Sequence, residues 1–271
     1  MPNTLQIEYE YRGIHHMAEL DLSGGEDARG DIADLLGKEE RKILTTGNAE
    51  IDKKIADGLP LGSLTLIEGE NDTGKSVLTQ QFIWGSMHNN LRVDLFSTEL
   101  TTKSFLTQME SMSLDISDFF AWGYIRLFHC HLVEFKWTPD AMNDILERII
   151  THVKFSNTDV AIIDSLTIFT EYTTTESVLT FLTQAKNICD QGKTILITMH
   201  TYAFTDEVLT RVRSICDAHL LLMRKLMGDK YVMVLEVVKV RGARKTTGNL
   251  VSFEVHPGYG MKIIPVSVAK V

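Results

Sequence analysis

The sequence predicts an α/β fold, in which a mostly parallel, twisted sheet carries helices on both faces and antiparallel strands at its C-terminal end. From Thr46 onward, apolar runs of strand length alternate with amphipathic segments of helix length, the pattern of parallel strands joined by crossovers. A glycine-containing turn at residues 69–74 separates the first such strand from the first such helix. The last third instead contains long strand-like runs around Met227-Gly228-Asp229, which predicts an antiparallel hairpin.

The elements follow one another in a regular order. Parallel strands are expected at the short apolar runs 63–68, 93–98, 124–130, 159–164 and 194–199. Helices are expected between them, at 75–87, from about 102, from 139 and at 176–191. Thr138 and Pro139 provide a hydroxyl N-cap followed by proline at the first helical position, and Gly192 ends the last of these helices. The predicted hairpin pairs 218–226 with 231–239, and one further strand is expected between Val251 and Ile264.

The chain is expected to fold as one domain preceded by an extension. Its 271 residues exceed the usual length of one domain, but α/β units with several crossovers commonly reach this size. The first residues include Ser23-Gly24-Gly25-Glu26-Asp27, a glycine- and acid-rich stretch with little periodicity. We therefore interpret residues 1–45 as an N-terminal arm and residues 46–271 as the domain.

Composition and charge argue against several classes of protein. Apolar residues make up 44% and charged residues 23%, as in an ordinary globular protein. A net charge of −9 repels polynucleotide phosphates, so no nucleic-acid partner is expected. Three widely spaced cysteines favour neither a disulfide framework nor a zinc site. Because no run of about 18 apolar residues and no secretion signal occurs, we expect a cytoplasmic protein with at most peripheral contact at the inner face of the membrane.

Residues 69–76, Gly-Glu-Asn-Asp-Thr-Gly-Lys-Ser, match the pattern G-x-x-x-x-G-K-[ST] of the phosphate-binding P-loop. Glycines let main-chain N–H groups point inward at phosphate oxygens, and the following helix presents its positive end to the same anion. Lys75 adds a charge for the β- and γ-phosphates of ATP, and the Ser76 hydroxyl is a ligand for Mg²⁺. A glycine turn with an incidental lysine is the alternative. The predicted nucleotide-binding residues are Gly69, Asn71, Asp72, Thr73, Gly74, Lys75, Ser76 and Val77.

Two carboxylates at strand ends are candidates for metal binding and catalysis. Asp164 ends the apolar run 160–164 and is the predicted Mg²⁺ ligand beside Ser76, although an aspartate that caps the next segment would give the same pattern. In many P-loop ATPases a water-orienting glutamate follows this aspartate directly, but here the next residue is Ser165. Glu99, at the carboxyl end of the second strand, is therefore the predicted catalytic glutamate, with an exposed surface glutamate as the alternative.

The strand at 195–199 ends beside two further polar residues. Thr198 and His200 lie at the same edge of the predicted sheet, where they could contact a γ-phosphate. A lone histidine at a strand end is more often a hydrogen-bonded polar residue without a catalytic role. Both interpretations stay open for His200.

These motifs, in this order, resemble the KaiC-like branch of the RecA superfamily. The similarity extends to the lead-in Thr46-Gly47-Asn48-Ala49-Glu50-Ile51-Asp52, to Gly58-Leu59-Pro60-Leu61-Gly62-Ser63, and to Lys239-Val240-Arg241-Gly242. The resemblance implies a RecA-like P-loop NTPase fold, in which Lys239 and Arg241 reach the γ-phosphate held by the neighbouring subunit of a ring. Such cations would couple ATP occupancy to assembly. With Lys75 and Glu99 they complete the predicted catalytic residues; a solvated basic strand is the alternative, since Arg244 and Lys245 lie close by.

Within this branch, the amino-acid sequence of the loop from Glu70 to Val77 and the single-domain length most resemble those of the accessory ATPases of the archaellum, the archaeal flagellum. The resemblance covers about residues 46–264. It implies ATP and Mg²⁺ as cofactors, self-association into a hexameric ring, and docking to the motor ATPase and membrane platform protein of the archaellum. KaiC-like enzymes often carry two adjacent glutamates after the second strand, whereas this chain has Thr98-Glu99, and Asp72 adds a negative charge to the P-loop. We therefore expect an ATP-binding protein that hydrolyses ATP slowly.

Three other functions stay open. A RecA-like ATPase of DNA recombination or repair would need basic or aromatic loops near the ring centre, and residues 201–212 offer only Arg211 among acids and hydroxyls. A KaiC-like autokinase would carry paired hydroxyls just before Asp217, where Arg213-Ser214-Ile215-Cys216 has one; the threonines 173–175 are more simply a helix N-terminus. The third alternative is a scaffold whose bound ATP never turns over.

Overall fold

The computed structural model describes residues 4–11, 14–21, 42–130, 138–170, 172–227, 230–243 and 250–264. The chain divides into two compact units, Met1–Arg41 and Lys42–Val271. In the first unit, β1 (Thr4–Tyr11) and β2 (Ile14–Asp21) pair antiparallel along their whole length. This hairpin was not predicted, because residues 1–45 were interpreted as an arm on the basis of the glycine- and acid-rich stretch that follows it.

The second unit begins at Lys42 rather than at Thr46. The residues that extend it are β3 (Ile43–Leu44), which pairs antiparallel with β4 (Leu59–Pro60). Leu44 is fully buried, so this short ribbon is part of the core. A two-residue strand has too little periodicity to be recognised in the sequence.

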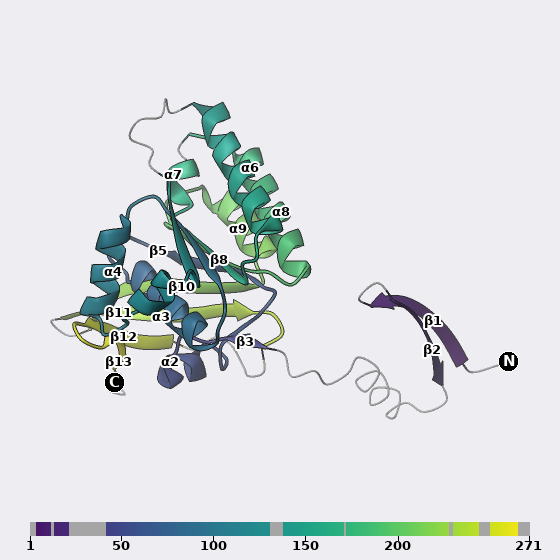
Figure 1. The fold of residues 1–271 in the computed structure, drawn as a ribbon, viewed down its shortest axis with the longest axis horizontal. Helices are drawn as coiled ribbons and strands as arrows, with labels where there is room; N and C mark the ends of the chain where they lie inside the picture. The colour runs from purple at the N-terminus through teal and green to yellow at the C-terminus, as the bar shows by residue number, and fades with distance from the viewer. Residues whose placement is uncertain are drawn as a thin grey trace. The chain divides into compact units, whose positions relative to one another are not determined.

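Nine of the described strands form one sheet in the order β13-β12-β11-β10-β5-β9-β8-β6-β7. Six of them are mutually parallel: β5 (Leu64–Gly69), β6 (Val93–Ser97), β7 (Ile125–His129), β8 (Val160–Asp164), β9 (Thr194–Met199) and β10 (Ala218–Met227). The first five were predicted as parallel strands, whereas β10 was predicted only as half of the antiparallel hairpin and also pairs parallel with β5. The antiparallel edge consists of β11 (Lys230–Val240), β12 (Leu250–His256) and β13 (Gly260–Ile263), drawn in yellow-green to yellow in Figure 1. The predicted hairpin β10–β11 is confirmed, but residues 228 and 229 of its turn lie outside the described residues.

The prediction of one strand between Val251 and Ile264 was wrong, because two strands occupy this stretch. β12 and β13 pair antiparallel around a tight turn, in which the Tyr259 amide donates to the His256 carbonyl at 3.1 Å. Gly258 and Gly260 have φ angles of +80° and +74°, which glycine adopts without steric cost. These two glycines allow the chain to reverse inside what reads as a continuous strand.

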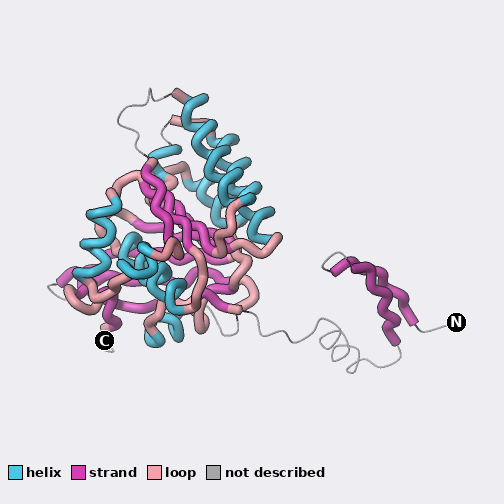
Figure 2. Tube along the Cα trace, in the orientation of Figure 1, coloured by secondary structure: helices cyan, strands magenta, loops and turns pink. Residues whose placement is uncertain are grey.

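Helices cover both faces of the sheet (Figures 1 and 2). One face packs against α2 (Ala49–Lys54), α3 (Lys75–His88), α4 (Thr102–Ser111) and α5 (Ser117–Ala121). The other packs against α6 (Pro139–Phe155), α7 (Thr167–Thr170), α8 (Thr175–Asp190) and α9 (Asp206–Ile215). Neighbouring residues of a central strand enter different cores: Ile162 lies in the first and Ile163 in the second. This two-sided burial explains why the parallel strands are apolar throughout rather than alternating.

Local signals place the helix ends where the sequence predicts them. Thr138 caps α6 by accepting from the Ala141 amide, with Pro139 at the first helical position. Thr174 caps α8, in agreement with the reading of residues 173–175 as a helix N-terminus. Gly192 follows the C-terminus of α8 with a φ of +104°. Among the described residues, none of the helices combines the length and apolar composition that a bilayer crossing requires.

Candidate nucleotide-binding site

The P-loop joins β5 to α3 at the carboxyl edge of the parallel strands. Its curvature depends on two positions with left-handed backbone, Asp72 with φ +57° and Gly74 with φ +91°. A side chain at Gly69 would place its Cβ 2.6 Å from Thr73 Oγ1 and 2.7 Å from the Leu222 carbonyl oxygen, so only glycine fits there. The Thr73 hydroxyl donates to the Glu70 carbonyl at 2.8 Å. The loop is therefore closed upon itself, in the form that turns main-chain amides toward an anion.

A cavity of about 430 Å³ lies against this loop. It brings together residues that the sequence distributes over five strands and helices. Its walls are Asn71, Asp72, Thr73, Gly74, Lys75, Ser76, Val77, Glu99, Gln108, Asp164, Ser165, His200, Met233 and Val255. All the predicted nucleotide-binding residues line it except Gly69, which lies buried at the end of β5.

Lys75 holds its ammonium group over the loop. The Nζ atom donates to the carbonyl oxygens of Gly69 at 3.0 Å and Glu70 at 2.6 Å. Burial lowers the pKa of Lys75, while the carboxylates of Asp164, Glu99 and Asp72 act in the opposite direction. The ammonium group of Lys75 is thus held by two main-chain carbonyls and lies beside the cavity that an anion would enter.

Asp164 is the carboxylate at the end of β8. Burial raises its pKa, and hydrogen bonds from Thr198 and Ser76, together with the charge of Lys75, oppose that shift. The Thr198 hydroxyl donates to Asp164 Oδ1 at 2.6 Å. The Ser76 hydroxyl and the Asp164 carboxylate thus form a hard oxygen donor pair, the type of ligand that Mg²⁺ prefers. These residues fit the metal that the sequence predicts.

Glu99 is exposed at the edge of the cavity, two residues beyond the end of β6 at Ser97. Its partial burial and the negative charge of Asp164 raise the pKa of its carboxyl group, while Lys75 acts against this shift. Ser165 also lines the cavity, and its amide donates to the Thr98 hydroxyl at 3.4 Å. Thr98, directly before Glu99, and Ser165, directly after Asp164, are therefore hydroxyl residues rather than a second glutamate.

His200 lines the cavity and belongs to a short polar chain. Its amide donates to the Thr167 hydroxyl at 2.9 Å, and Nδ1 lies 3.0 Å from the same oxygen. The ring stacks on Tyr202 with 5.0 Å between centroids, and the Tyr202 hydroxyl donates to Asn71 Oδ1 at 3.3 Å. Burial and the nearby Lys75 lower the pKa of His200. The interpretation of His200 as a hydrogen-bonded polar residue fits these contacts.

Sequence reasoning missed four residues at or beside the cavity: Gln108, Tyr202, Met233 and Val255. Met233 and Val255 supply apolar side chains from the antiparallel strands. Gln108 Oε1 accepts from Gln80 Nε2 of α3 at 2.8 Å, across a helix–helix contact. No local sequence pattern identifies these positions as site residues. Tyr202 is the exception, because it lies two residues after His200, which was already a candidate at the end of its strand.

Lys239 and Arg241, termed here the cation pair, do not lie at the P-loop of their own chain. β11 runs antiparallel to β10, so Lys239 lies opposite His219, near the amino end of β10. The Arg241 amide donates to the Asp217 carbonyl, and the Asp217 amide donates to Leu64 at the start of β5. At about 3.3 Å per residue, Leu64 is about 16 Å along β5 from Gly69, and Leu66, which pairs with His219 opposite Lys239, is about 10 Å from it, two strands away from β11. The cation pair is therefore beyond reach of a phosphate bound to the same chain.

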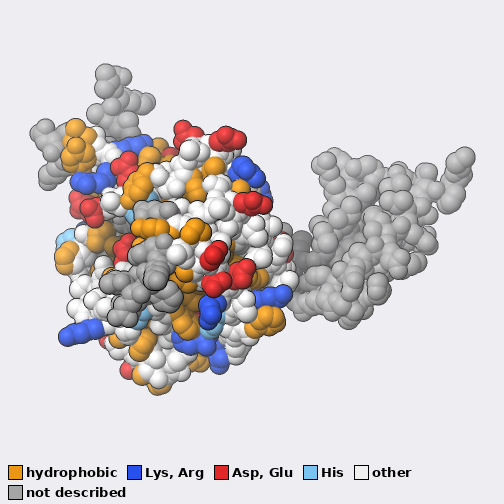
Figure 3. Space-filling view, turned by 90° about the horizontal axis from the view of Figure 1, so that it is seen from above, with side chains coloured by type: hydrophobic (Ala, Val, Ile, Leu, Met, Phe, Trp, Pro, Cys, Tyr) orange, Lys and Arg blue, Asp and Glu red, His pale blue; other side chains and the backbone are white. Residues whose placement is uncertain are grey.

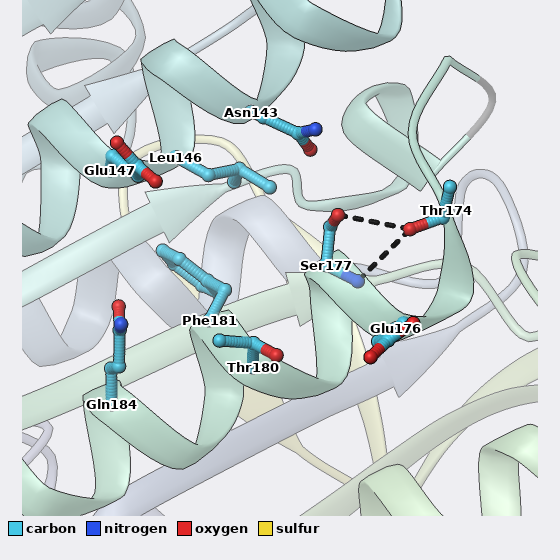
Figure 4. Close-up of a pocket in the computed structure, with 9 residues that line it drawn as sticks. All are labelled: Asn143, Leu146, Glu147, Thr174, Glu176, Ser177, Thr180, Phe181 and Gln184. Carbon is cyan, nitrogen blue, oxygen red and sulfur yellow. Dashed lines mark hydrogen bonds between the residues drawn. The ribbon is translucent and has the colours of Figure 1, made fainter.

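Another hollow lies between α6 and α8, away from the P-loop (Figure 4). Its lining includes two carboxylates, Glu147 and Glu176, and contains no lysine or arginine. The Thr174 hydroxyl within it accepts from the Ser177 amide and contacts the Ser177 hydroxyl, the capping bonds of α8. Unlike the P-loop cavity, where Lys75 lies beside the carboxylates, this hollow has no cation in its lining to attract a phosphate, and it is not the nucleotide site. On the face shown in Figure 3, acidic and basic side chains are interspersed.

Comparison with known proteins agrees with the fold and the loop. The family model of KaiC ATPases matches residues 44–268. The archaeal flagellar ATP-binding protein FlaH of Sulfolobus acidocaldarius is 32% identical over 228 residues, which are 84% of this chain and 99% of that protein. The crystal structure of FlaH from Methanocaldococcus jannaschii superimposes with a TM-score of 0.73 at 25% identity, over 83% of this chain and all of that one. A KaiC-like protein of Pyrococcus horikoshii shares the fold, with a TM-score of 0.67, at 20% identity over 83% of this chain and 99% of that one. The chain therefore belongs to the KaiC family of ATPases and is similar, within it, to the FlaH proteins of the archaeal flagellum.

Proposed function

We propose that this protein binds Mg·ATP at the P-loop, hydrolyses it slowly, and acts as an ATP-controlled assembly component of the archaellum. The observation that carries the proposal is the single cavity in which the P-loop, Asp164 and Glu99 meet. The link to the archaellum is supported by the 32% identity to a FlaH protein over nearly all of that protein's length.

Each residue of the cavity has a separate role in this proposal. Main-chain amides of the P-loop and Lys75 bind the phosphates, and Ser76 with Asp164 holds Mg²⁺. The bound metal supplies positive charge to the phosphate oxygens. Glu99, whose pKa is raised, accepts a proton more readily than an ordinary glutamate. Because Glu99 is exposed and has no glutamate beside it, water is poorly ordered there and hydrolysis is slow.

The cation pair completes the site in trans under this proposal. Lys239 and Arg241 cannot contact the phosphates of their own chain, so they neutralise the triphosphate of a neighbouring copy in a ring, which we expect to be hexameric. ATP then stabilises the subunit contact. The assembled form docks to the motor ATPase and membrane platform protein of the archaellum, at the cytoplasmic face of the membrane. Archaellin and motor genes beside this one would support that placement.

The first test is calorimetric titration of Mg·ATP into the full-length protein. We expect heat of binding from the wild type and at least tenfold weaker binding by Lys75→Ala, because the lost contact is a charge-assisted one. Lys103→Ala, a substitution of an exposed lysine on α4, is the matched control and should bind as the wild type. Equal affinity in wild type and Lys75→Ala would refute the proposed site.

Sedimentation velocity and phosphate release test the remaining parts. ATP should promote assembly of the wild type, and Lys239→Gln/Arg241→Gln should bind ATP normally but stay unassembled. Glu99→Gln should release phosphate more slowly than the wild type, whereas Glu110→Gln, on the exposed end of α4, should not. Equal rates in Glu99→Gln and wild type would remove Glu99 from catalysis. Absence of any phosphate release would favour a scaffold.

A further inference from the structure

The last turn of α9 contacts both members of the cation pair. Carbonyl groups at a helix C-terminus have no partner within the helix and must be satisfied from outside it. The Arg213 carbonyl accepts from Lys239 Nζ at 2.5 Å, and the Ser214 carbonyl accepts from Arg241 Nη2 at 3.1 Å. The negative end of the helix dipole also favours cations at this position. The cation pair is thus held by two neighbouring carbonyls of one helix turn.

The Arg213 side chain fixes this last turn of α9 to β5, the strand that precedes the P-loop. Arg213 Nε and Nη2 donate to the two oxygens of Glu68 at 2.9 and 2.5 Å. Glu68 directly precedes Gly69 and is fully buried, whereas the Arg213 side chain is 36% exposed. Bidentate pairs of this kind fix orientation as well as distance. Arg213 therefore sets where the last turn of α9 lies relative to β5.

The other neighbour of Glu68 does not provide the same constraint. His219 Nε2 lies 2.9 Å from Glu68 Oε2, but its alignment is not that of a hydrogen bond, and Nε2 has no hydrogen-bond partner. Lys239 does not contact Glu68 directly and reaches this cluster through the Arg213 carbonyl. Arg213 thus connects the P-loop end of β5 to the helix turn that holds the cation pair, whereas Asp217 connects Arg241 to the start of the same strand at Leu64.

The two cations need such a support because they repel each other. Lys239 is half-buried and Arg241 is 56% exposed. Burial is the main cause that lowers the pKa of Lys239, and the positive charge of Arg241 lowers it further. The nearest carboxylate of Arg241 is Asp217, at 3.7 Å, which is a loose contact. Without the two fixed carbonyls, these long side chains would be free to move apart into solvent.

We propose that Arg213 is a positioning residue, which clamps the last turn of α9 to Glu68 and thereby holds Lys239 and Arg241 in place for the triphosphate of a second copy. This inference rests on the proposed trans-acting role of the cation pair. It makes a specific prediction: loss of Arg213 impairs the subunit as a donor of cations, while its own nucleotide site keeps its affinity.

Mixing variants separates these two roles. Lys75→Ala has an intact cation pair but no nucleotide site, whereas Lys239→Gln/Arg241→Gln has a nucleotide site but no cation pair. In an equal mixture with Mg·ATP, the cation pair of the first can contact the nucleotide of the second. Sedimentation velocity should therefore detect heterodimers. Arg213→Gln should bind ATP within about twofold of the wild type, yet need at least about tenfold more ATP to assemble. It should form heterodimers with Lys75→Ala and none with Lys239→Gln/Arg241→Gln.

A matched substitution on the same helix controls for damage to α9. Arg211→Gln removes an exposed arginine that lines the groove toward α8, and it should assemble as the wild type. Arg213→Lys keeps one charged contact but not the bidentate geometry and should fall between Arg213→Gln and the wild type. If Arg213→Gln does not fold because Glu68 is left unpaired, Glu68→Gln/Arg213→Gln removes that buried charge and should give the same mixing pattern.

The outcomes that contradict the proposal differ from one another. Unchanged assembly of folded Arg213→Gln would show that Arg213 does not position the cation pair. Heterodimers with Lys239→Gln/Arg241→Gln but not with Lys75→Ala would place the defect in the nucleotide site of Arg213→Gln itself. If the reference mixture of Lys75→Ala with Lys239→Gln/Arg241→Gln forms no heterodimers although the wild type assembles, the trans-acting role fails, and this inference fails with it.

Discussion

Glu68 carries a charge in the interior of the protein, and its replacement should cost stability in a pH-dependent way. On its own, burial would raise the pKa of this carboxyl group. The close contacts with His219 and Arg213, together with their charges, outweigh burial and hold the pKa at about 2, compared with an ordinary value of 4.5. His219 Nε2 lies 2.9 Å from one oxygen of Glu68, and Arg213 donates to both oxygens.

The size and sign of the effect follow from this difference. At about 1.4 kcal/mol per pH unit, a pKa lowered from 4.5 to about 2 corresponds to about 3 kcal/mol of folding free energy. Because the pKa is lower in the folded protein, this contribution is complete above pH 4.5 and is lost as the pH falls toward 2. Glutamine at position 68 cannot titrate. Glu68→Gln should therefore be less stable than the wild type near neutral pH by about 3 kcal/mol, and the difference should disappear in acid.

Urea unfolding followed by circular dichroism measures this difference at about pH 7, 5 and 3. Glu110→Gln is the control, because Glu110 is exposed, and its free energy of unfolding should stay within about 0.5 kcal/mol of the wild type at each pH. A difference between wild type and Glu68→Gln that stays constant down to about pH 3 would refute the reasoning, since it would mean that Glu68 titrates like an ordinary glutamate.

Three further predictions concern the core and the site. A Cβ at Gly85 would lie 2.0 Å from a backbone carbonyl oxygen, so Gly85→Ala should lower the free energy of unfolding by about 1–3 kcal/mol in urea titrations, and an unchanged midpoint would contradict this contact. Thr198→Val removes the donor to Asp164, so it should weaken Mg·ATP binding several-fold in calorimetry while leaving Mg²⁺-free binding unchanged. Burial and Lys75 lower the pKa of His200 below 6.5, so ATP affinity should show no step near that pH; a step that His200→Gln abolishes would contradict this assignment.

The parallel strands were predictable because strands buried on both faces have a recognisable local sequence. Both faces of β8 and β9 are covered by helices, so these strands are apolar at nearly every position and are recognised without alternation. α9 was missed for the opposite reason: it buries only Leu209 and Val212, and the rest of its surface is polar. β12 and β13 were merged because the turn between them is only a few residues long.

The candidate site divides in the same way. Lys75, Ser76 and Asp164 could be predicted because the chemistry of phosphate and Mg²⁺ dictates residue types at fixed local positions. The contact of Arg213 with Glu68 joins residues 145 positions apart, and that of Tyr202 with Asn71 joins residues 131 apart. Such pairs depend on strand order and register, which no single stretch of sequence contains.

The reversal of chain direction between β10 and β11 has a consequence for the geometry of any assembly. It places the P-loop and the cation pair at opposite ends of one sheet, so a contact between them joins two unlike patches, head to tail. Head-to-tail contacts close into a ring only when the rotation per subunit divides a full circle, and otherwise continue as a helical filament. The rotation that brings the cation pair of one subunit onto the P-loop of the next therefore decides between a closed ring and an open filament.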